Sequence, residues 1–483
     1  MKASLARRNG INFWFNWTWN QWLGGLFLIF LGCLNLIWPV PILVLVVSLL
    51  VVLCFLMWPY AALVAATFLI GFDGITIAYF YKLFGYGYGI CYFMAVFGLL
   101  CWCTARLAKI TPPYQSTTLD LPLAIFAISC VIAVLWSAFP QDGVHVAIYT
   151  TMGYCLYLLI SALNYKPQHL ERLFWLWFLL GILTVLTTFS TFFFALIKSY
   201  HIYDQLYFRI YITQFDGTRV TLNGTMGAGA KAIAALLDVS ILCGLTLYCT
   251  QVRRNLRLLI LAGILIMLFV HFMTLTRLET MCLFLGWLTF VHLNPQWRNH
   301  RIRPHLWAAA SVLVIFVALL VMFNLLAGAS ELFARALGQE QTVGYRFSGW
   351  QNRWDHIVVA VQGIWNTAGL GAGTRGIMRE MDPSAWIDSP SLYFSVLTDH
   401  GYGILSLMLM GWIMINLFAE LRWAWLKCPD PRYKIFILGV FSCLVNFGNP
   451  FGDQFFYIYH MWIMLGFSVT AVKGVRYLIK SSP

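Results

Sequence analysis

Long runs of apolar residues, each close to the length that crosses a bilayer, recur along almost the whole chain. A transmembrane helix needs about 20 mainly apolar residues, and such runs alternate here with Pro, Gly or basic clusters. Of the 483 residues, 61% are hydrophobic and only 10% are charged, whereas a soluble domain has about 45–50% apolar and about 25% charged residues. Composition therefore excludes a soluble enzyme, a fibre, a disordered chain and a disulfide scaffold. It predicts an all-α polytopic membrane bundle of about 12–14 transmembrane helices.

The positions of the apolar runs divide the chain. The expected spans are 22–38, 41–58, 60–80, 87–104, 119–138, 144–164, 173–198, 226–250, 258–275, 278–293, 306–327, 390–419, 435–449 and 454–473. Only Pro39 and Pro59 separate the first three runs, so that region can alternatively hold a re-entrant pair. We expect N-terminal membrane helices over 1–198, a central region over 199–419 with two long outer loops, and C-terminal helices over 420–483.

The distribution of Lys and Arg predicts the orientation, because connections rich in these residues stay in the cytoplasm. With Lys2, Arg7 and Arg8 placed inside, nearly every second connection is basic. The other residues assigned to the inside are Arg106, Lys109, Lys166, Arg172, Arg253, Arg254, Arg257, Arg298, Arg301, Arg303, Arg422, Lys427, Arg432, Lys434, Lys473, Arg476 and Lys480. Both termini are therefore predicted to be cytoplasmic.

A second group of basic residues falls on or near the outer side, where the orientation rule does not account for it. These residues are Lys82, Lys198, Arg209, Arg219, Lys231, Arg277, Arg335, Arg346, Arg353, Arg375 and Arg379. Most belong to or flank two outer loops, 199–225 and 328–389, whose length is typical of functional or disordered segments. Apolar residues from Trp350 to Trp365 follow helical spacing, which predicts an amphipathic helix along the membrane surface in the second loop.

The outer arginines suggest an anionic ligand. Arg277 lies between two apolar runs too close together for a real loop, so its guanidinium is partly desolvated and needs a partner. That partner is either Glu279 or a neighbour within the bundle, or a bound phosphate, which the planar guanidinium can hold with two hydrogen bonds. Together with Arg219, Arg346 and Arg353, it predicts a multiply charged ligand such as a diphosphate. No CxxC or HExxH motif is present, so we expect no metal site.

Candidates for proton transfer on the outer side are few. They are Asp355, His356, Asp382, Asp388, Asp399 and His400. Asp238 also falls inside an apolar run, where an ionisable residue is either functional or paired within the bundle. We interpret His271, beside the Arg277 segment, as a histidine of the core.

Several motifs follow one another between about residues 210 and 405. They are Arg219 with Asn223-Gly224, the Thr-x-Thr-Arg277 segment, Arg346-x-x-x-Trp350, the Gly369-Leu-Gly371-Ala-Gly373 turn, Asp388-Ser389, Tyr393 and Gly401-Tyr-Gly403. In these motifs the chain resembles the superfamily of O-antigen ligases and O-antigen polymerases. Ligases of this superfamily usually carry His-Asn where this chain has Asp388-Ser389. The departure favours the branch of polymerases that make capsular or exopolysaccharide.

The resemblance implies a membrane glycosyltransferase at the outer face of the bacterial inner membrane. Such an enzyme transfers an oligosaccharide from a polyprenyl diphosphate to a saccharide acceptor without a metal or other cofactor. Arg219 and Arg277 would bind the diphosphate with help from Arg346 or Arg353, and Asp388 or His400 would accept the proton. A chain-length regulator and a flippase are implied as partners, and no nucleic acid is expected.

Two other functions remain open at this stage. One is ligation of the glycan to lipid A-core or another acceptor. The other is transport of an anionic glycolipid. Transporters often contain internal repeats; none is visible at half-length, and the basic residues cluster on one side, which favours the enzyme.

Overall fold

A computed structural model describes residues 49, 51–70, 90–109, 111–198, 213–216, 219–222, 230–274, 277–294, 358, 361–373, 396–398, 400–447 and 459–481. Among these residues, six helices are long and apolar enough to cross a membrane, and four shorter helices are also apolar. The predicted class, an all-α membrane bundle, is confirmed. Predicted spans 22–38 and 306–327 lie outside the described residues.

The chain forms two compact units. The first comprises Met1–Ala62 and Phe97–Pro113, and the second Leu63–Val96 and Tyr114–Pro483. Helices α4 (Pro59–Ile70) and α6 (Ile90–Leu107) are each divided between them. Within the first unit, the rings of Phe55 and Phe97 pack with their centroids 5.9 Å apart.

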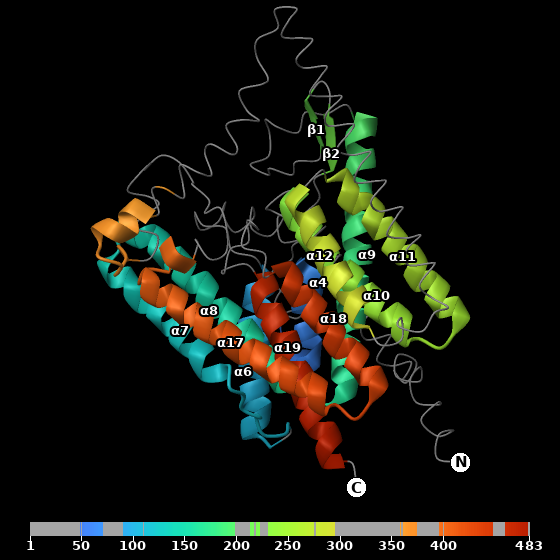
Figure 1. The fold of residues 1–483 in the computed structure, drawn as a ribbon, viewed down its shortest axis with the longest axis horizontal. Helices are drawn as coiled ribbons and strands as arrows, with labels where there is room; N and C mark the ends of the chain where they lie inside the picture. Colours follow the sequence, from blue (N-terminus) through green and yellow to red (C-terminus); the bar gives the residue numbers. More distant parts are fainter. Residues whose placement is uncertain are drawn as a thin grey trace, which may run out of the picture. The chain divides into compact units, whose positions relative to one another are not determined.

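Most of the described structure belongs to the second unit (Figure 1). Its main helices are α7 (Asp120–Ala133), continued by the 3-10 turn η1 (Val134–Trp136), α8 (Pro140–Leu163), α9 (Pro167–Lys198), α10 (Ala230–Thr250), α11 (Arg254–Met273), α12 (Arg277–Leu293), α17 (Ile404–Lys427), α18 (Pro431–Phe447) and α19 (Tyr459–Ser481). Proline stands at the start of α8, α9 and α18, where its missing N–H has no helical partner to lose. Several connections are only a few residues long, so consecutive helices run in opposite directions.

Helix α10 is the centre of the second unit. It contacts α9, α11, α12 and α18, and nearly every residue from Ile233 to Thr250 is buried. A helix that is apolar on all sides is expected in such a position. Close packing around it depends on small residues: a methyl group on Gly286 of α12 would lie 2.9 Å from the Ser442 carbonyl oxygen of α18.

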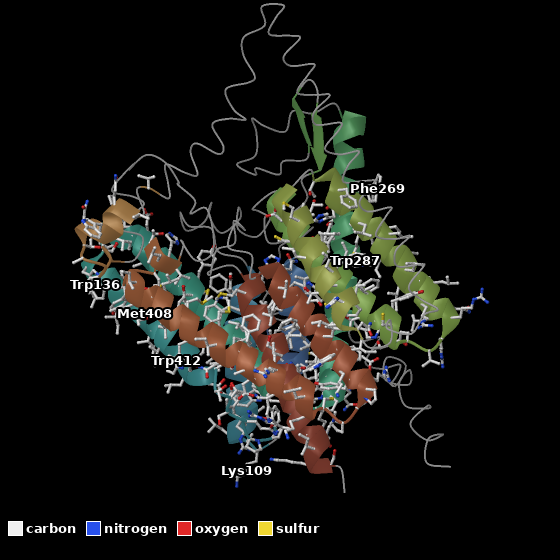
Figure 2. All side chains as sticks on the ribbon, in the orientation of Figure 1. Lys109, Trp136, Phe269, Trp287, Met408 and Trp412 are labelled. Carbon is white, nitrogen blue, oxygen red and sulfur yellow. The ribbon has the colours of Figure 1, made fainter. Side chains whose placement is uncertain are left out.

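Helix α17, by contrast, exposes much of its apolar surface. Leu405, Met408, Trp412 and Ile415 are between 44% and 71% exposed, at the spacing of one helical face. Figure 2 labels Met408 and Trp412 on this helix. In a membrane protein such a face is expected to contact lipid.

Two predicted spans near the C-terminus differ from the helices of the structure. Within 390–419, residues 396–398 are helical, and α17 runs from Ile404 beyond the predicted end to Lys427. Gly401 and Gly403 precede α17 with φ of 105° and 55°, a left-handed backbone that interrupts the helix. The last predicted span stops at 473, but α19 continues to Ser481. Lys473, predicted in a cytoplasmic connection, is instead only 2% exposed and lies in the bundle.

The two segments predicted to be outer loops, 199–225 and 328–389, are described in part. The first contains a hairpin of strands β1 (Thr213–Asp216) and β2 (Arg219–Leu222), antiparallel, in which Asp216 pairs with Arg219. In the second loop, 361–366 is helical, with Ile364 8% exposed and Trp365 85% exposed. Part of the predicted helix is thus helical, whereas Trp350 and Trp354 lie outside the described residues, and its location along the membrane surface stays a prediction.

Candidate functional site

The hairpin brings the backbone of Arg219 to one end of the helical bundle. Strand β2 begins at Arg219 and contacts α11, and α12 begins at Arg277, four residues after α11 ends. Figure 1 shows the hairpin at the end of the bundle where α11 turns into α12. We call this the Arg277 end; α10 and α12 begin here, and α11 finishes here.

Three further residues of the predicted site lie outside the described residues. They are Arg346 and Arg353, predicted to contact the diphosphate, and Asp388, predicted to accept the proton. Their predicted roles therefore stay predictions.

His400, a predicted proton acceptor, is fully buried in the turn before α17. Its Nε2 lies 2.8 Å from the Phe126 carbonyl oxygen of α7, and its Nδ1 lies 2.8 Å from Ser406 Oγ. Because a carbonyl only accepts, Nε2 carries the proton and Nδ1 accepts from Ser406. The Ser406 oxygen in turn accepts the backbone N–H of Tyr402. Both ring nitrogens are thus occupied within the protein, an arrangement that holds the turn against α7.

Glycines account for the close approach of the segment Gly369–Gly373 to this turn. Gly369, Gly371 and Gly373 all have φ near 80°. The N–H of Gly373 donates to Gly401 O (3.3 Å), and the N–H of Ile404 donates to Gly369 O (3.0 Å). A methyl group on Gly371 would lie 2.6 Å from the Gly403 nitrogen. The predicted glycine motifs thus form a backbone-to-backbone contact that fixes the start of α17.

A cluster of buried polar residues lies close to the Arg277 end, between α10, α11, α12 and α18. His271 Nδ1 of α11 lies 3.1 Å from Asp238 Oδ1 of α10, and both side chains are completely buried. The other ring nitrogen, Nε2, lies 3.2 Å from Thr280 Oγ1 of α12. Glu279, 5% exposed, and Asn446 of α18, 1% exposed, lie near the same carboxylate. Ionisable groups this deep in a membrane bundle are costly and commonly functional.

The contact between Asp238 and His271 is close but does not have the geometry of a hydrogen bond. The cluster brings polar side chains of α10, α11, α12 and α18 together in the interior of the bundle.

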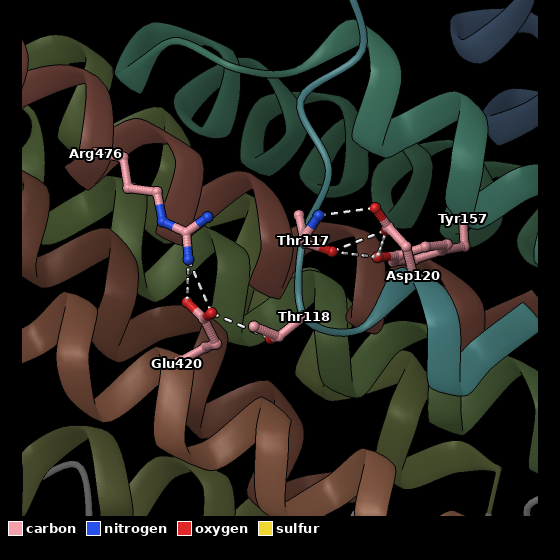
Figure 3. A network of polar contacts seen from close by, with 6 residues as sticks. All are labelled: Thr117, Thr118, Asp120, Tyr157, Glu420 and Arg476. Carbon is pink, nitrogen blue, oxygen red and sulfur yellow. Dashed lines mark hydrogen bonds and ion pairs between the residues drawn. The ribbon is translucent and has the colours of Figure 1, made fainter.

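A second polar network lies at the opposite end of the second unit (Figure 3). Asp120 Oδ1 accepts hydrogen bonds from Tyr157 (2.7 Å), Tyr114 (2.9 Å) and the Thr117 hydroxyl (2.8 Å), and Oδ2 accepts the Thr117 N–H (2.7 Å). Burial raises the pKa of the Tyr114 hydroxyl, which therefore stays a neutral donor. The carboxylate is saturated by these donors, so this network is structural.

Three cationic contacts extend this second network to α19. The Lys473 ammonium donates to the carbonyl and the hydroxyl oxygen of Ser161 (2.7 and 2.8 Å) and lies 4.6 Å from the centroid of the Tyr114 ring. Arg476 Nη2 donates to both Glu420 oxygens at 2.8 and 2.9 Å. These contacts join the end of α19 to α8, α17 and the segment before α7.

The pairing of Asp238 with His271 was not predicted from the sequence. Each residue stands out as an ionisable group within an apolar run, but their separation along the chain gives no sign that they meet. Only the antiparallel packing of α10 and α11 brings them together. The described residues contain no group of three or more His, Cys, Asp or Glu able to hold a metal ion.

Comparison with known proteins gives no assignment. No protein-family model matches this chain, and no curated protein matches it significantly.

Proposed function

We propose that this chain is a membrane glycosyltransferase that moves an oligosaccharide from a polyprenyl diphosphate to a saccharide acceptor. The observation that carries the proposal is the contact of β2, which begins with Arg219, with α11, whose end leads directly into Arg277. Two arginine-bearing segments far apart in sequence thereby share one end of an apolar bundle. A lipid-linked diphosphate needs this combination of positive charge and access from the bilayer.

The proposed chemistry assigns charge neutralisation to the arginines. The acceptor oxygen attacks the anomeric carbon, the bond from that carbon to the diphosphate oxygen breaks, and the lipid diphosphate leaves with the electron pair. Arg219 and Arg277 would stabilise the leaving group, with Arg346 and Arg353 assisting. The N-terminus of α12, at Arg277, adds a favourable dipole for an anion. We expect transfer to be insensitive to chelators.

Asp388 is the better of the two proposed proton acceptors. His400 has both ring nitrogens in hydrogen bonds to Phe126 and Ser406, so accepting a substrate proton would first require breaking one of them. A general base needs a free lone pair within hydrogen-bonding reach of the substrate hydroxyl. We therefore assign this role to Asp388.

We further propose that the enzyme polymerises repeat units of an exopolysaccharide or O-antigen at the outer face of the inner membrane, alongside a flippase and a chain-length regulator. Asp388-Ser389, where ligases carry His-Asn, supports this choice over ligation. Deletion of the gene followed by glycan analysis separates the alternatives. Loss of long polysaccharide, with single units still reaching their acceptor, is expected for a polymerase. Full-length polymer accumulating on the carrier would mean a ligase, and repeat units retained on the cytoplasmic leaflet would mean a transporter.

A further inference from the structure

The buried chain of contacts from Asp238 through His271 to Thr280 has no part in the chemistry proposed above. It links α10, α11 and α12 at successive distances of 3.1 and 3.2 Å. The last link is made to the first turn of α12, three residues after Arg277. Residues three apart on a helix are neighbours on its surface. A contact that fixes the orientation of Thr280 about the axis of α12 therefore also fixes the position of Arg277 about that axis.

We infer that Asp238, His271 and Thr280 are positioning residues, which hold the first turn of α12 and with it Arg277 at the diphosphate site. The expected effect of these residues on activity rests on the proposed function. Their expected effect on the position of Arg277 does not.

The end of α11 is itself held in place. The Thr274 hydroxyl donates to the His271 carbonyl oxygen at 2.5 Å, and the Thr274 N–H donates to the carbonyls of Val270 and His271. The imidazole therefore projects from an ordered final turn, and its ring reaches both neighbouring helices. On the far side, α10 is the most enclosed helix of the unit, so Asp238 offers a fixed anchor.

The approach of His271 Nδ1 to Asp238 Oδ1 at 3.1 Å lacks hydrogen-bond geometry, so this link is a close contact between two completely buried groups. His271 Nε2 and Thr280 Oγ1, 3.2 Å apart, form a hydrogen bond in which either atom can be the donor. The link to the first turn of α12 therefore does not depend on which atom carries the proton, which suits a positioning role better than an acid–base role.

Thr280→Val is the variant that tests this inference, because it removes the hydroxyl with little change of shape. Thr280→Ser keeps the hydroxyl and should restore the parent behaviour. Thr289→Val is the matched control on the same helix, since the Thr289 hydroxyl donates to Leu285 O one turn earlier on α12. If Thr280→Val fails to insert, Thr280→Ala removes the same hydroxyl with less bulk.

The first measurement does not require turnover. The full-length Arg277→Cys variant is reconstituted in nanodiscs, and its rate of labelling by a polar maleimide is measured. The labelling of the native cysteines, measured with the protein that keeps Arg277, is subtracted. Adding Thr280→Val should change the labelling rate by about threefold or more, because the first turn is released. Adding Thr280→Ser or Thr289→Val should leave it unchanged. An unchanged rate with Thr280→Val overturns the inference, whatever the activity.

The second measurement uses a polyprenyl-diphosphate-linked repeat unit as donor. Thr280→Val, with Arg277 present, should raise the KM for the donor by about tenfold, leave the KM for the acceptor unchanged, and be rescued by Thr280→Ser. A fall in kcat alone with both KM values unchanged would indicate a smaller folded fraction and contradict positioning. If labelling responds as expected but the parent protein transfers no glycan, the proposed function fails and the positioning role stands.

Discussion

Arg277 is the residue on which the proposed chemistry depends most. Arg277 is the first residue of α12. In the proposed reaction, the negative charge of the leaving diphosphate builds up beside it. Arg277→Ala should lower the rate of transfer by about 10²–10³-fold, as the loss of one charge-stabilising donor does elsewhere. Initial rates with purified protein in proteoliposomes give the measurement.

Arg254→Ala is the matched control for that change. Arg254 is exposed and starts α11 at the end of the helix remote from Arg277. The Arg254→Ala substitution removes one positive charge, as Arg277→Ala does, but from the other end of the bundle. Because surface substitutions away from special features have small effects, activity should stay within about twofold of the parent. Equal losses in both variants would mean that only net charge matters and would remove Arg277 from the proposed site.

Asp120 and Glu420 offer a second comparison, because Asp120 accepts from the completely buried Tyr157, whereas Glu420 accepts from the 38% exposed Arg476. Asp120→Ala leaves the buried Tyr157 hydroxyl and its neighbours without their acceptor, at a cost of about 1–3 kcal/mol per buried group. Glu420→Gln weakens an ion pair whose arginine is 38% exposed, a loss of about 0–1 kcal/mol. Thermal unfolding in detergent should therefore show a much lower Tm for Asp120→Ala. A drop as large for Glu420→Gln would contradict this ranking.

Among the helices and turns, the start of α17 depends on glycines. Gly371 has a φ of 78°, and a methyl group there would lie 2.6 Å from the Gly403 nitrogen and 2.7 Å from the Gly401 oxygen. Gly371→Ala should therefore lower the stability by about 1–2 kcal/mol from the backbone conformation alone, with the steric clash in addition. A lower Tm by thermal unfolding is the expected result.

Gly411→Ala on α17 is the control for the glycine experiment. A methyl group at Gly411 has no neighbouring atom within 4 Å, and Ala is favoured over Gly in a helix by about 1 kcal/mol. Its Tm should be unchanged or higher. If both alanine variants lower the Tm equally, the contact between the glycine turns does not secure the helix start.

The elements that the sequence predicts well are those with one dominant local signal. A long apolar run is sufficient to indicate α8 or α10, because burial of the whole helix decides its structure. The start of α17 was missed since apolar residues continue before Gly401, and the break lies in backbone angles rather than hydropathy. The hairpin was missed although Gly217, the first of the two residues between Asp216 and Arg219, is a residue type favoured in two-residue turns. The Asp238–His271 contact could not be predicted, because it depends on how two helices pack.

On the scale of the whole molecule, the directions of the helices constrain the part of the chain between α12 and α17. Phe290, near the end of α12, packs with Cys249 at the end of α10 and with Ile435 and Leu438 near the start of α18. The start of α18 thus lies opposite the Arg277 end, and so does the end of α17, because only three residues separate the two helices. Helix α12 finishes at the end where α17 also finishes, and α17 therefore begins at the Arg277 end. Asn294, which follows α12, and Gly403, which precedes α17, therefore lie at opposite ends of the bundle.

This geometry predicts that Arg219 and Lys480 face opposite sides of the membrane. Arg219 precedes α10 at the Arg277 end, whereas Lys480 is exposed near the end of α19, and Arg476 of that helix pairs with Glu420 near the end of α17. Basic residues are retained on the cytoplasmic side during insertion, so the Lys480 side should be the cytoplasm. In intact spheroplasts, an impermeant maleimide should label Arg219→Cys, and should label Lys480→Cys only after permeabilisation. Labelling of both cysteines from outside would contradict the prediction that the two residues face opposite sides of the membrane. Labelling of Lys480→Cys from outside, and of Arg219→Cys only after permeabilisation, would mean that they face opposite sides in the inverted orientation.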